Sequence, residues 1–178
     1  MRTIMPWALA PLAVLLLAGC GGGQTAHLAP TDKTLGATVQ ADSAHAALAR
    51  VVTNAGLDVA LAGVGPYTLF APPDAALKVD FADAAMKAED AALLRAHLAP
   101  GTLTRADISS AIDHAPGKSA QIRTLSGELL TFTRQGKDII VTAPDGAHAR
   151  LTGAESLVSN GALQPVDALL LNPDAAQG

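Results

Sequence analysis

The apolar positions of the first half of the chain repeat at helical spacing. Between residues 44 and 55 they form one stripe, made of Ala44, Ala47, Leu48, Val51, Val52 and Ala55. This spacing predicts an amphipathic helix. Asp42 or Ser43 can cap its start, and Gly56 suits the left-handed residue that ends a helix. The β-favouring run at residues 67–71 lies between prolines and predicts a strand.

A second helix is expected further on, and the pattern then changes. Pro73 and Asp74 suit the first turn of a short helix after the strand, and the alanine-rich residues 81–97 favour a longer helix that Pro100 and Gly101 end. Four β-favouring runs follow, separated by SG, QG and DG turn signals, at residues 122–125, 128–133, 138–142 and 149–152. A last apolar run at 168–171 predicts a closing strand. Helices followed by a meander of strands predict an α+β fold.

The start of the chain has the architecture of an export signal. Arg2 precedes an apolar stretch at residues 4–19, which is shorter than the ~20 residues that span a bilayer and is followed by glycines. Residues 17–20, LAGC, resemble the bacterial lipobox, in which acyl chains such as palmitate are attached to the cysteine and the peptide is cut before it. We therefore predict a lipoprotein signal peptide at 1–19 and lipidation of Cys20. The alternative is a free Cys20 thiol after an ordinary signal peptide.

The predicted anchor also suggests a location and an organisation for the rest of the chain. Gly21, where an aspartate would favour retention in the inner membrane, favours the bacterial outer membrane, with the protein facing the periplasm or the cell surface. Residues 20–41 are predicted to be the lipidated cysteine with a flexible tether, residues 42–173 one domain, and residues 174–178 a C-terminal tail.

Composition and charge exclude several classes of protein. The single cysteine excludes an intrachain disulfide framework and a multi-cysteine zinc site. Twelve basic and 16 acidic residues give a net charge of −4, and only 3% of the residues are aromatic. Nucleic-acid binding needs a basic surface or aromatic platforms, so we predict no nucleic-acid partner.

The chain contains no pattern that predicts catalysis or a cofactor. It has no GxSxG, HExxH or phosphate-binding glycine loop, and its five histidines are scattered. We therefore predict that the protein is not an enzyme and holds no metal or cofactor. His97 is either a contact residue or, as we favour, a buried imidazole bonded to nearby backbone. For Asp74, Asp107 and Asp167, capping or turn hydrogen bonds are favoured over catalysis.

Three segments, in order along the chain, resemble the signature boxes of the fasciclin domain family. They are GPYTLFAPPDAAL from Gly65, LLRAHLAPGTLTRADI from Leu93 and NGALQPVDALLLNP from Asn160. Within them, matching positions include Asp74, His97, Asp107, Asn160 and Asp167. The resemblance implies a single α+β domain in which N-terminal helices pack on a mostly antiparallel β-sheet wedge or sandwich. Asn160 and Gly161 are expected to form a left-handed turn before the last strand.

The chain also departs from the family pattern. Ala96 replaces the tyrosine before His97, Gln164 replaces the usual histidine, and Pro73 replaces a threonine. The tyrosine–histidine pair is linked in animal members of the family to integrin adhesion. That activity is therefore not carried over to this chain.

These observations predict a non-catalytic, membrane-anchored interaction module. Its role would be cell adhesion or envelope or matrix binding, strengthened by avidity, with a partner that the sequence does not name and with weak self-association. The alternative is an extracytoplasmic carrier of a small apolar ligand such as a lipid or a pigment, which the scarcity of aromatic residues disfavours.

Overall fold

The computed structural model describes residues 29–77 and 87–172. The predicted signal peptide, Cys20 and the first residues of the predicted second helix lie outside these ranges. Within them, no helix is both long enough and apolar enough to cross a membrane.

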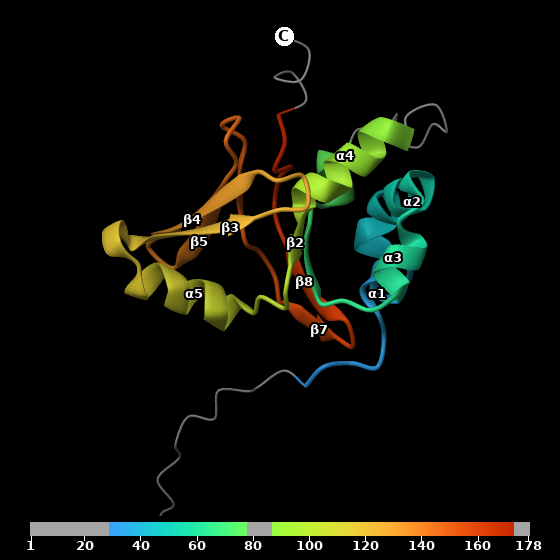
Figure 1. The fold of residues 1–178 in the computed structure, drawn as a ribbon, viewed down its shortest axis with the longest axis horizontal. Helices are drawn as coiled ribbons and strands as arrows, with labels where there is room; N and C mark the ends of the chain where they lie inside the picture. The colour runs from blue at the N-terminus through green and yellow to red at the C-terminus, as the bar shows by residue number, and fades with distance from the viewer. Residues whose placement is uncertain (1–28, 78–86, 173–178) are drawn as a thin grey trace, which may run out of the picture.

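Two four-stranded sheets form the framework (Figure 1). The first, sheet A, has the order β2-β1-β8-β7 and contains β1 (Tyr67–Ala71), β2 (Leu98–Pro100), β7 (Ser156–Val158) and β8 (Gly161–Pro165). The second, sheet B, is the antiparallel meander β3 (Ser119–Arg123), β4 (Leu129–Gln135), β5 (Asp138–Thr142) and β6 (His148–Arg150). Only β1 and β8 pair in parallel. The α+β prediction is confirmed.

The helices form two groups: one covers a face of sheet A, and the other lies against sheet B. The first group is α1 (Leu35–Ala41), α2 (Ala46–Ala55), α3 (Asp58–Ala62) and α4 (Lys87–His97), which gather on one side of sheet A in Figure 1. α5 (Arg105–His114) packs on β3 and β4. Short 3₁₀ turns occur at Ser43–His45, Asp74–Ala76 and Pro116–Lys118.

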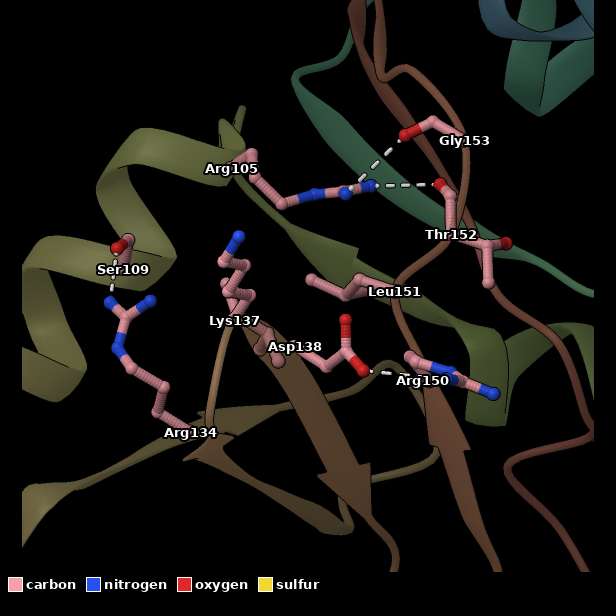
Figure 2. A pocket seen from close by; sticks show the side chains of 10 residues that line it. Arg105, Ser109, Arg134, Lys137, Asp138, Arg150, Leu151, Thr152 and Gly153 are labelled. Carbon is pink, nitrogen blue, oxygen red and sulfur yellow. Dashed lines mark hydrogen bonds and ion pairs between the residues drawn. The ribbon is translucent and has the colours of Figure 1, made fainter.

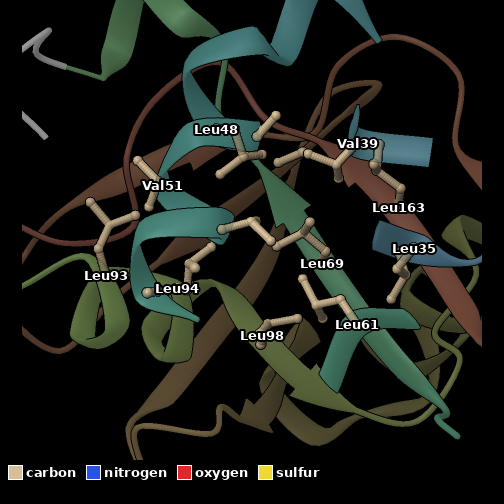
Figure 3. Packing of buried hydrophobic residues seen from close by; sticks show 14 of the residues in the cluster. Leu35, Val39, Leu48, Val51, Leu61, Leu69, Leu93, Leu94, Leu98 and Leu163 are labelled. Carbon is tan, nitrogen blue, oxygen red and sulfur yellow. The ribbon is translucent and has the colours of Figure 1, made fainter. Parts of the chain in front are cut away.

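Strand β1 contributes to two hydrophobic cores because neighbouring side chains in a strand point to opposite faces. Leu69 belongs to the core between sheet A and helices α1–α4, which Figure 3 shows, together with Leu163 of β8. Phe70 points into the second core, between sheet A, sheet B and α5. There its ring lies 5.5 Å from that of Phe132, centroid to centroid. Sheet A is therefore packed on both faces.

The predicted helix over 44–55 is present as a 3₁₀ turn that leads into α2. Asp42 caps the turn, because its Oδ1 accepts a hydrogen bond from the Ala44 amide at 2.9 Å. Gly56 has φ +69°, and the Leu57 amide donates to the carbonyl of Val52 at 3.1 Å. This is the left-handed helix stop that glycine favours.

Three local predictions differ from the structure. Residues 35–41, predicted as the end of the tether, form α1, because Thr34 caps the helix and Leu35 and Val39 are fully buried in the first core. The closing strand is β8 and not residues 168–171. Glycine at 161 allows β8 to approach β1 closely, whereas the later apolar segment forms no strand and only its Leu170 is fully buried.

The third difference concerns the segment after β1. Asp74 begins a short 3₁₀ turn with Pro73 just before it, rather than within a first helical turn. The Asp74 carboxylate instead accepts a bond from the Ala47 amide at 2.8 Å. It therefore satisfies a free amide at the start of α2, a helix that precedes it in the chain.

Candidate functional site

His97, at the end of α4, is fully buried and makes two backbone hydrogen bonds. Its Nδ1 donates to the Leu93 carbonyl at 2.8 Å, and its Nε2 accepts from the Leu170 amide at 3.0 Å. Because a carbonyl only accepts and an amide only donates, these partners fix the neutral tautomer with its proton on Nδ1. Burial is the main reason that the pKa of His97 falls to about 4, and the bond to Leu93 opposes it. This geometry matches the buried-imidazole interpretation.

Asp107 and Asp167 are engaged in local bonds. Asp107 and Thr104 form a capping box at the start of α5, and the bonds from Thr104 lower the pKa of the Asp107 carboxyl. Asp167 accepts the Arg150 amide at 2.7 Å and the Arg150 Nε at 3.2 Å. It thereby fixes the chain after β8 to β6, the last strand of sheet B.

Asn160 joins three segments at the other end of sheet A. Its Oδ1 accepts from the Leu35 amide of α1 at 2.8 Å, and its Nδ2 donates to the carbonyls of Leu61 and Gly63 at 2.8 and 2.9 Å. The following glycine, Gly161, has φ +154°. Asn160 itself does not have a positive φ, so the expected left-handed conformation falls on Gly161 alone.

The five candidate residues therefore do not form one site. Each has its own set of hydrogen-bond partners, and none of these partners is shared. In the part of the chain that the structure describes, no group of three or more His, Cys, Asp or Glu side chains could hold a metal ion. Their arrangement supports folding rather than a common chemical centre.

A different set of side chains meets in a cleft of about 500 Å³ between α5, the β4–β5 turn and the end of β6 (Figure 2). Four cationic side chains line it, together with Asp138, Ser109 and the segment 151–153. The cations are Arg105, Arg134, Lys137 and Arg150. Sequence reasoning did not single out any of them.

Arg105 is the best-held cation of the cleft. Its Nε and Nη2 both donate to Oε1 of Gln164 at 3.1 Å, and Nη2 also donates to the Thr152 carbonyl at 3.1 Å. Burial lowers the pKa of the Arg105 guanidinium, and the charge of Glu155 opposes that shift. The side chain is therefore fixed at the wall of the cleft.

Gln164 is the buried centre of this arrangement. Its Nε2 donates to the Leu103 carbonyl at 2.9 Å and to Glu155 Oε2 at 2.6 Å, while its Oε1 accepts from Arg105. Because an amide has both a donor and an acceptor end, it can join a guanidinium to a carboxylate. The replacement of the family histidine by Gln164 is a sequence signal from which this region could have been found, although no site was predicted from it.

The remaining cations differ in how they are paired. Arg134 donates to Ser109 Oγ and to Asp113 Oδ2, the latter at 3.1 Å. Arg150 pairs with Asp138 at 3.3 Å and with Asp167 at 3.2 Å, and these bonds raise its pKa.

The fold and these bonds define a class of protein: a small α+β domain whose recognisable polar residues hold its segments together. The particular family follows from comparison, because the model of the fasciclin domain matches residues 43–172. The chain belongs to the fasciclin domain family. Domains of this family are generally adhesion or interaction modules without enzymatic activity.

Among solved structures, the chain is similar to the FAS1 domain pair from the insect cell adhesion molecule Fasciclin I. The TM-score is 0.68 at 14% sequence identity, and the match covers 80% of this chain and 52% of that one. The chain thus spans about half the length of that domain pair, and the likeness concerns the fold. Comparison with curated proteins finds no match.

Proposed function

We propose that the protein is a non-catalytic interaction module that acts in cell adhesion or in binding to the envelope or matrix. The observation that carries the proposal is that the residues matching the family boxes are used to hold the fold together. His97 joins α4 to the segment after β8, and Asn160 joins α1 to α3 and to the loop before β1. Because these residues are used in folding, we expect other residues on the surface of the domain to bind the partner.

We further propose that the protein is exported and held at the bacterial outer membrane by acyl chains on Cys20. The support is the leader sequence, with LAGC at its end and Gly21 after it. One acyl chain binds a membrane only marginally, whereas two or three chains hold a protein stably. The full chain should therefore remain with the membrane through washing and should incorporate a fatty-acid probe.

The matched variant for the anchor is Cys20→Ser, which removes only the sulfur that would carry the lipid. It should be released from the membrane or accumulate with its leader uncut, and it should not incorporate the probe. A wild-type protein that is fully released and unlabelled would contradict the anchor while leaving the interaction function open.

Avidity is the expected source of adhesive strength. The described surface carries few aromatic side chains of the kind that dominate tight interfaces, so one domain should bind weakly. Many copies on one membrane raise the effective concentration and can strengthen attachment by roughly 10² to 10⁴ without any new contact. Vesicles densely coated with the lipidated chain should aggregate or attach to envelope material, whereas sparsely coated vesicles should not.

The experiment compares both coatings with the Cys20→Ser protein at equal protein concentration. Attachment that is equally tight for the free variant would indicate a high-affinity receptor instead of an adhesion module. Turnover of a substrate by either form would indicate an enzyme.

One observation favours the alternative function, a carrier of a small apolar ligand. A groove of about 730 Å³ lies at the end of sheet A beside the chain entry, and its lining includes Pro30, Val64, Pro66 and Leu157. Mass spectrometry of the protein purified from its own membrane tests this function. A bound lipid or pigment in stoichiometric amount would favour it over adhesion.

A further inference from the structure

The cleft of Figure 2 gathers four cationic side chains on a protein that is acidic as a whole. The chain has a net charge of −4, and four of its 12 lysine and arginine residues line the cleft with one carboxylate, Asp138. Three further carboxylates, those of Asp113, Asp167 and Glu155, offset the charges of Arg134, Arg150 and Arg105 from outside the lining. Like charges that share a cleft repel one another, and low-dielectric walls strengthen the field that they create. Among the described residues, Lys137 is the cation of the cleft without such a carboxylate, so an anion gains energy by approaching it.

Two of the cations are already oriented by the protein. Arg105 is held by Gln164 and by the carbonyls of Thr152 and Gly153, and Arg134 is held by Ser109 and Asp113. A ligand that meets fixed side chains loses less free energy to ordering them.

Lys137 is the unpaired cation of the cleft. It occupies the turn between β4 and β5, and among the described residues its ammonium group has no hydrogen-bond or ion-pair partner. Figure 2 shows it extending between the guanidinium groups of Arg105 and Arg134. The nearby carboxylate of Asp138 is instead engaged by Arg150.

The arrangement favours a phosphate group over a carboxylate. Arg105, Arg134 and Lys137 approach from three different elements, the start of α5, the end of β4 and the β4–β5 turn. A tetrahedral oxyanion offers oxygens in several directions, whereas a carboxylate offers two oxygens in one plane. A phosphate monoester also carries about 1.5 to 2 negative charges at pH 7, which suits several cations better than a single charge does.

We infer that this cleft is a binding site for a phosphate monoester, with Lys137 as the principal free cation and Arg105 and Arg134 as fixed donors. This inference rests on the proposed function, which places the partner in the envelope. It deepens that function by naming the chemical group that the domain binds. The same group occurs in free phosphate and on the headgroups of membrane lipids, and the experiment separates these two sources.

The first measurement is calorimetric titration of inorganic phosphate into the full chain in non-ionic detergent at low salt. Saturable binding is expected, and it should weaken as salt is added. Lys137→Gln should weaken it about tenfold, since a charge-assisted bond contributes free energy of that order. Arg134→Gln should weaken it as well, and circular dichroism confirms that each variant is folded.

Lys33→Gln is the matched control. It removes the same charge from an exposed lysine next to α1, outside the cleft. It should leave phosphate binding unchanged. Absence of saturable binding to the wild-type chain, or equal weakening by Lys33→Gln and Lys137→Gln, would overturn the inference.

The second measurement identifies the source of the group. The Cys20→Ser chain, which carries no acyl chains, is mixed without detergent with phosphatidylcholine vesicles that contain phosphatidic acid, a monoester, or the same fraction of phosphatidylglycerol, a diester. Lys137-dependent binding to the phosphatidic acid vesicles would assign a lipid source, and binding only to inorganic phosphate would assign a free one. Binding to neither probe would overturn the phosphate site, while the vesicle aggregation test of adhesion could still succeed.

Discussion

The imidazole of His97 links two segments that are 73 residues apart in the chain. It is buried and neutral, and both of its ring nitrogens are hydrogen-bonded to backbone groups, one in α4 and one in the segment after β8. Replacing it with alanine would leave the Leu170 amide buried without its partner, which costs about 1 to 3 kcal/mol. Loss of any binding by His97→Ala should therefore follow loss of stability.

The same residue predicts how stability depends on pH. The pKa of His97 is about 4 in the fold against 6.5 for an ordinary histidine. Because the folded pKa is the lower one, the unfolded chain binds a proton first, so stability is present above about pH 6.5 and declines as the pH falls towards 4. This difference in pKa changes the free energy of unfolding by about 3 kcal/mol between neutral pH and low pH.

Urea unfolding of wild type and His97→Gln between pH 8 and pH 4 measures this contribution. The difference between the two proteins should be largest at neutral pH and shrink across the window from pH 6.5 to pH 4. A constant difference over that range would contradict the buried neutral imidazole.

Asp90 is a residue whose burial works against stability. Its side chain on α4 is buried, and within the described ranges neither carboxyl oxygen has a partner that meets hydrogen-bond geometry. Burial raises its pKa above 3.8, although the Asn54 amide opposes that shift. The charged form is therefore disfavoured in the fold, so the contribution of Asp90 to stability is greatest below about pH 3.8 and declines as the pH rises through the folded pKa.

Asp90→Asn should accordingly stabilise the protein at pH 7, by about 1 kcal/mol. Glu89→Gln is the control, since Glu89 is an exposed neighbour in the same first turn and its loss has a similar effect on the helix dipole. Thermal unfolding at pH 7 and pH 3.5 checks the prediction. Destabilisation by Asp90→Asn at pH 7 would show that the carboxylate is paired.

At the scale of elements, α1 belongs to the domain and stabilises it. Leu35 and Val39 are fully buried, and the Leu35 amide satisfies Asn160. Burying two such side chains contributes at least about 3 kcal/mol. A fragment that begins at residue 42 should therefore be less stable by that amount than one that begins at residue 29, as measured by urea unfolding. Equal midpoints would mean that α1 is dispensable.

The parallel pairing of β1 and β8 depends on a glycine. A Cβ added to Gly161 would lie 1.8 Å from the Tyr67 carbonyl oxygen, so the two strands would have to separate. Gly161→Ala should lower the free energy of unfolding by at least about 3 kcal/mol. Gly127→Ala is the control, because Gly127 also has a positive φ but open space around it, and it should cost only about 1 kcal/mol.

Local patterns predicted the elements that carry strong local signals. The apolar stripe and Gly56 predicted α2, and the turn glycines separated the strands of sheet B. α1 was not predicted because its seven residues bury only three, which is too short a repeat to distinguish from a loop. The position of β8 beside β1 joins residues more than 90 positions apart, and no local pattern specifies such a pairing.

For the whole molecule, the cleft is the feature that could not be predicted from the sequence. Its walls come from α5, from the β4–β5 turn and from β6. In the sequence, each of its cations looks like an ordinary surface residue. Their combined effect exists only after α5 has packed on sheet B. The buried signature residues were easier to find, because they lie inside the motifs that define the family.

The described chain enters at one end of sheet A and leaves at the other. Near the entry, Thr31 pairs with Val158, and near the exit, Leu170 meets His97, so the two ends point in opposite directions along the strands (Figure 1). A pull on both ends would load the bonds between β1 and β8 together, in shear, rather than opening them one after another. Stretching single molecules through residues 29 and 172 should therefore need more force than stretching them across the hairpin of β4 and β5, whose bonds would part in sequence. A domain that links a membrane to a partner would in this way carry tension along its strongest direction.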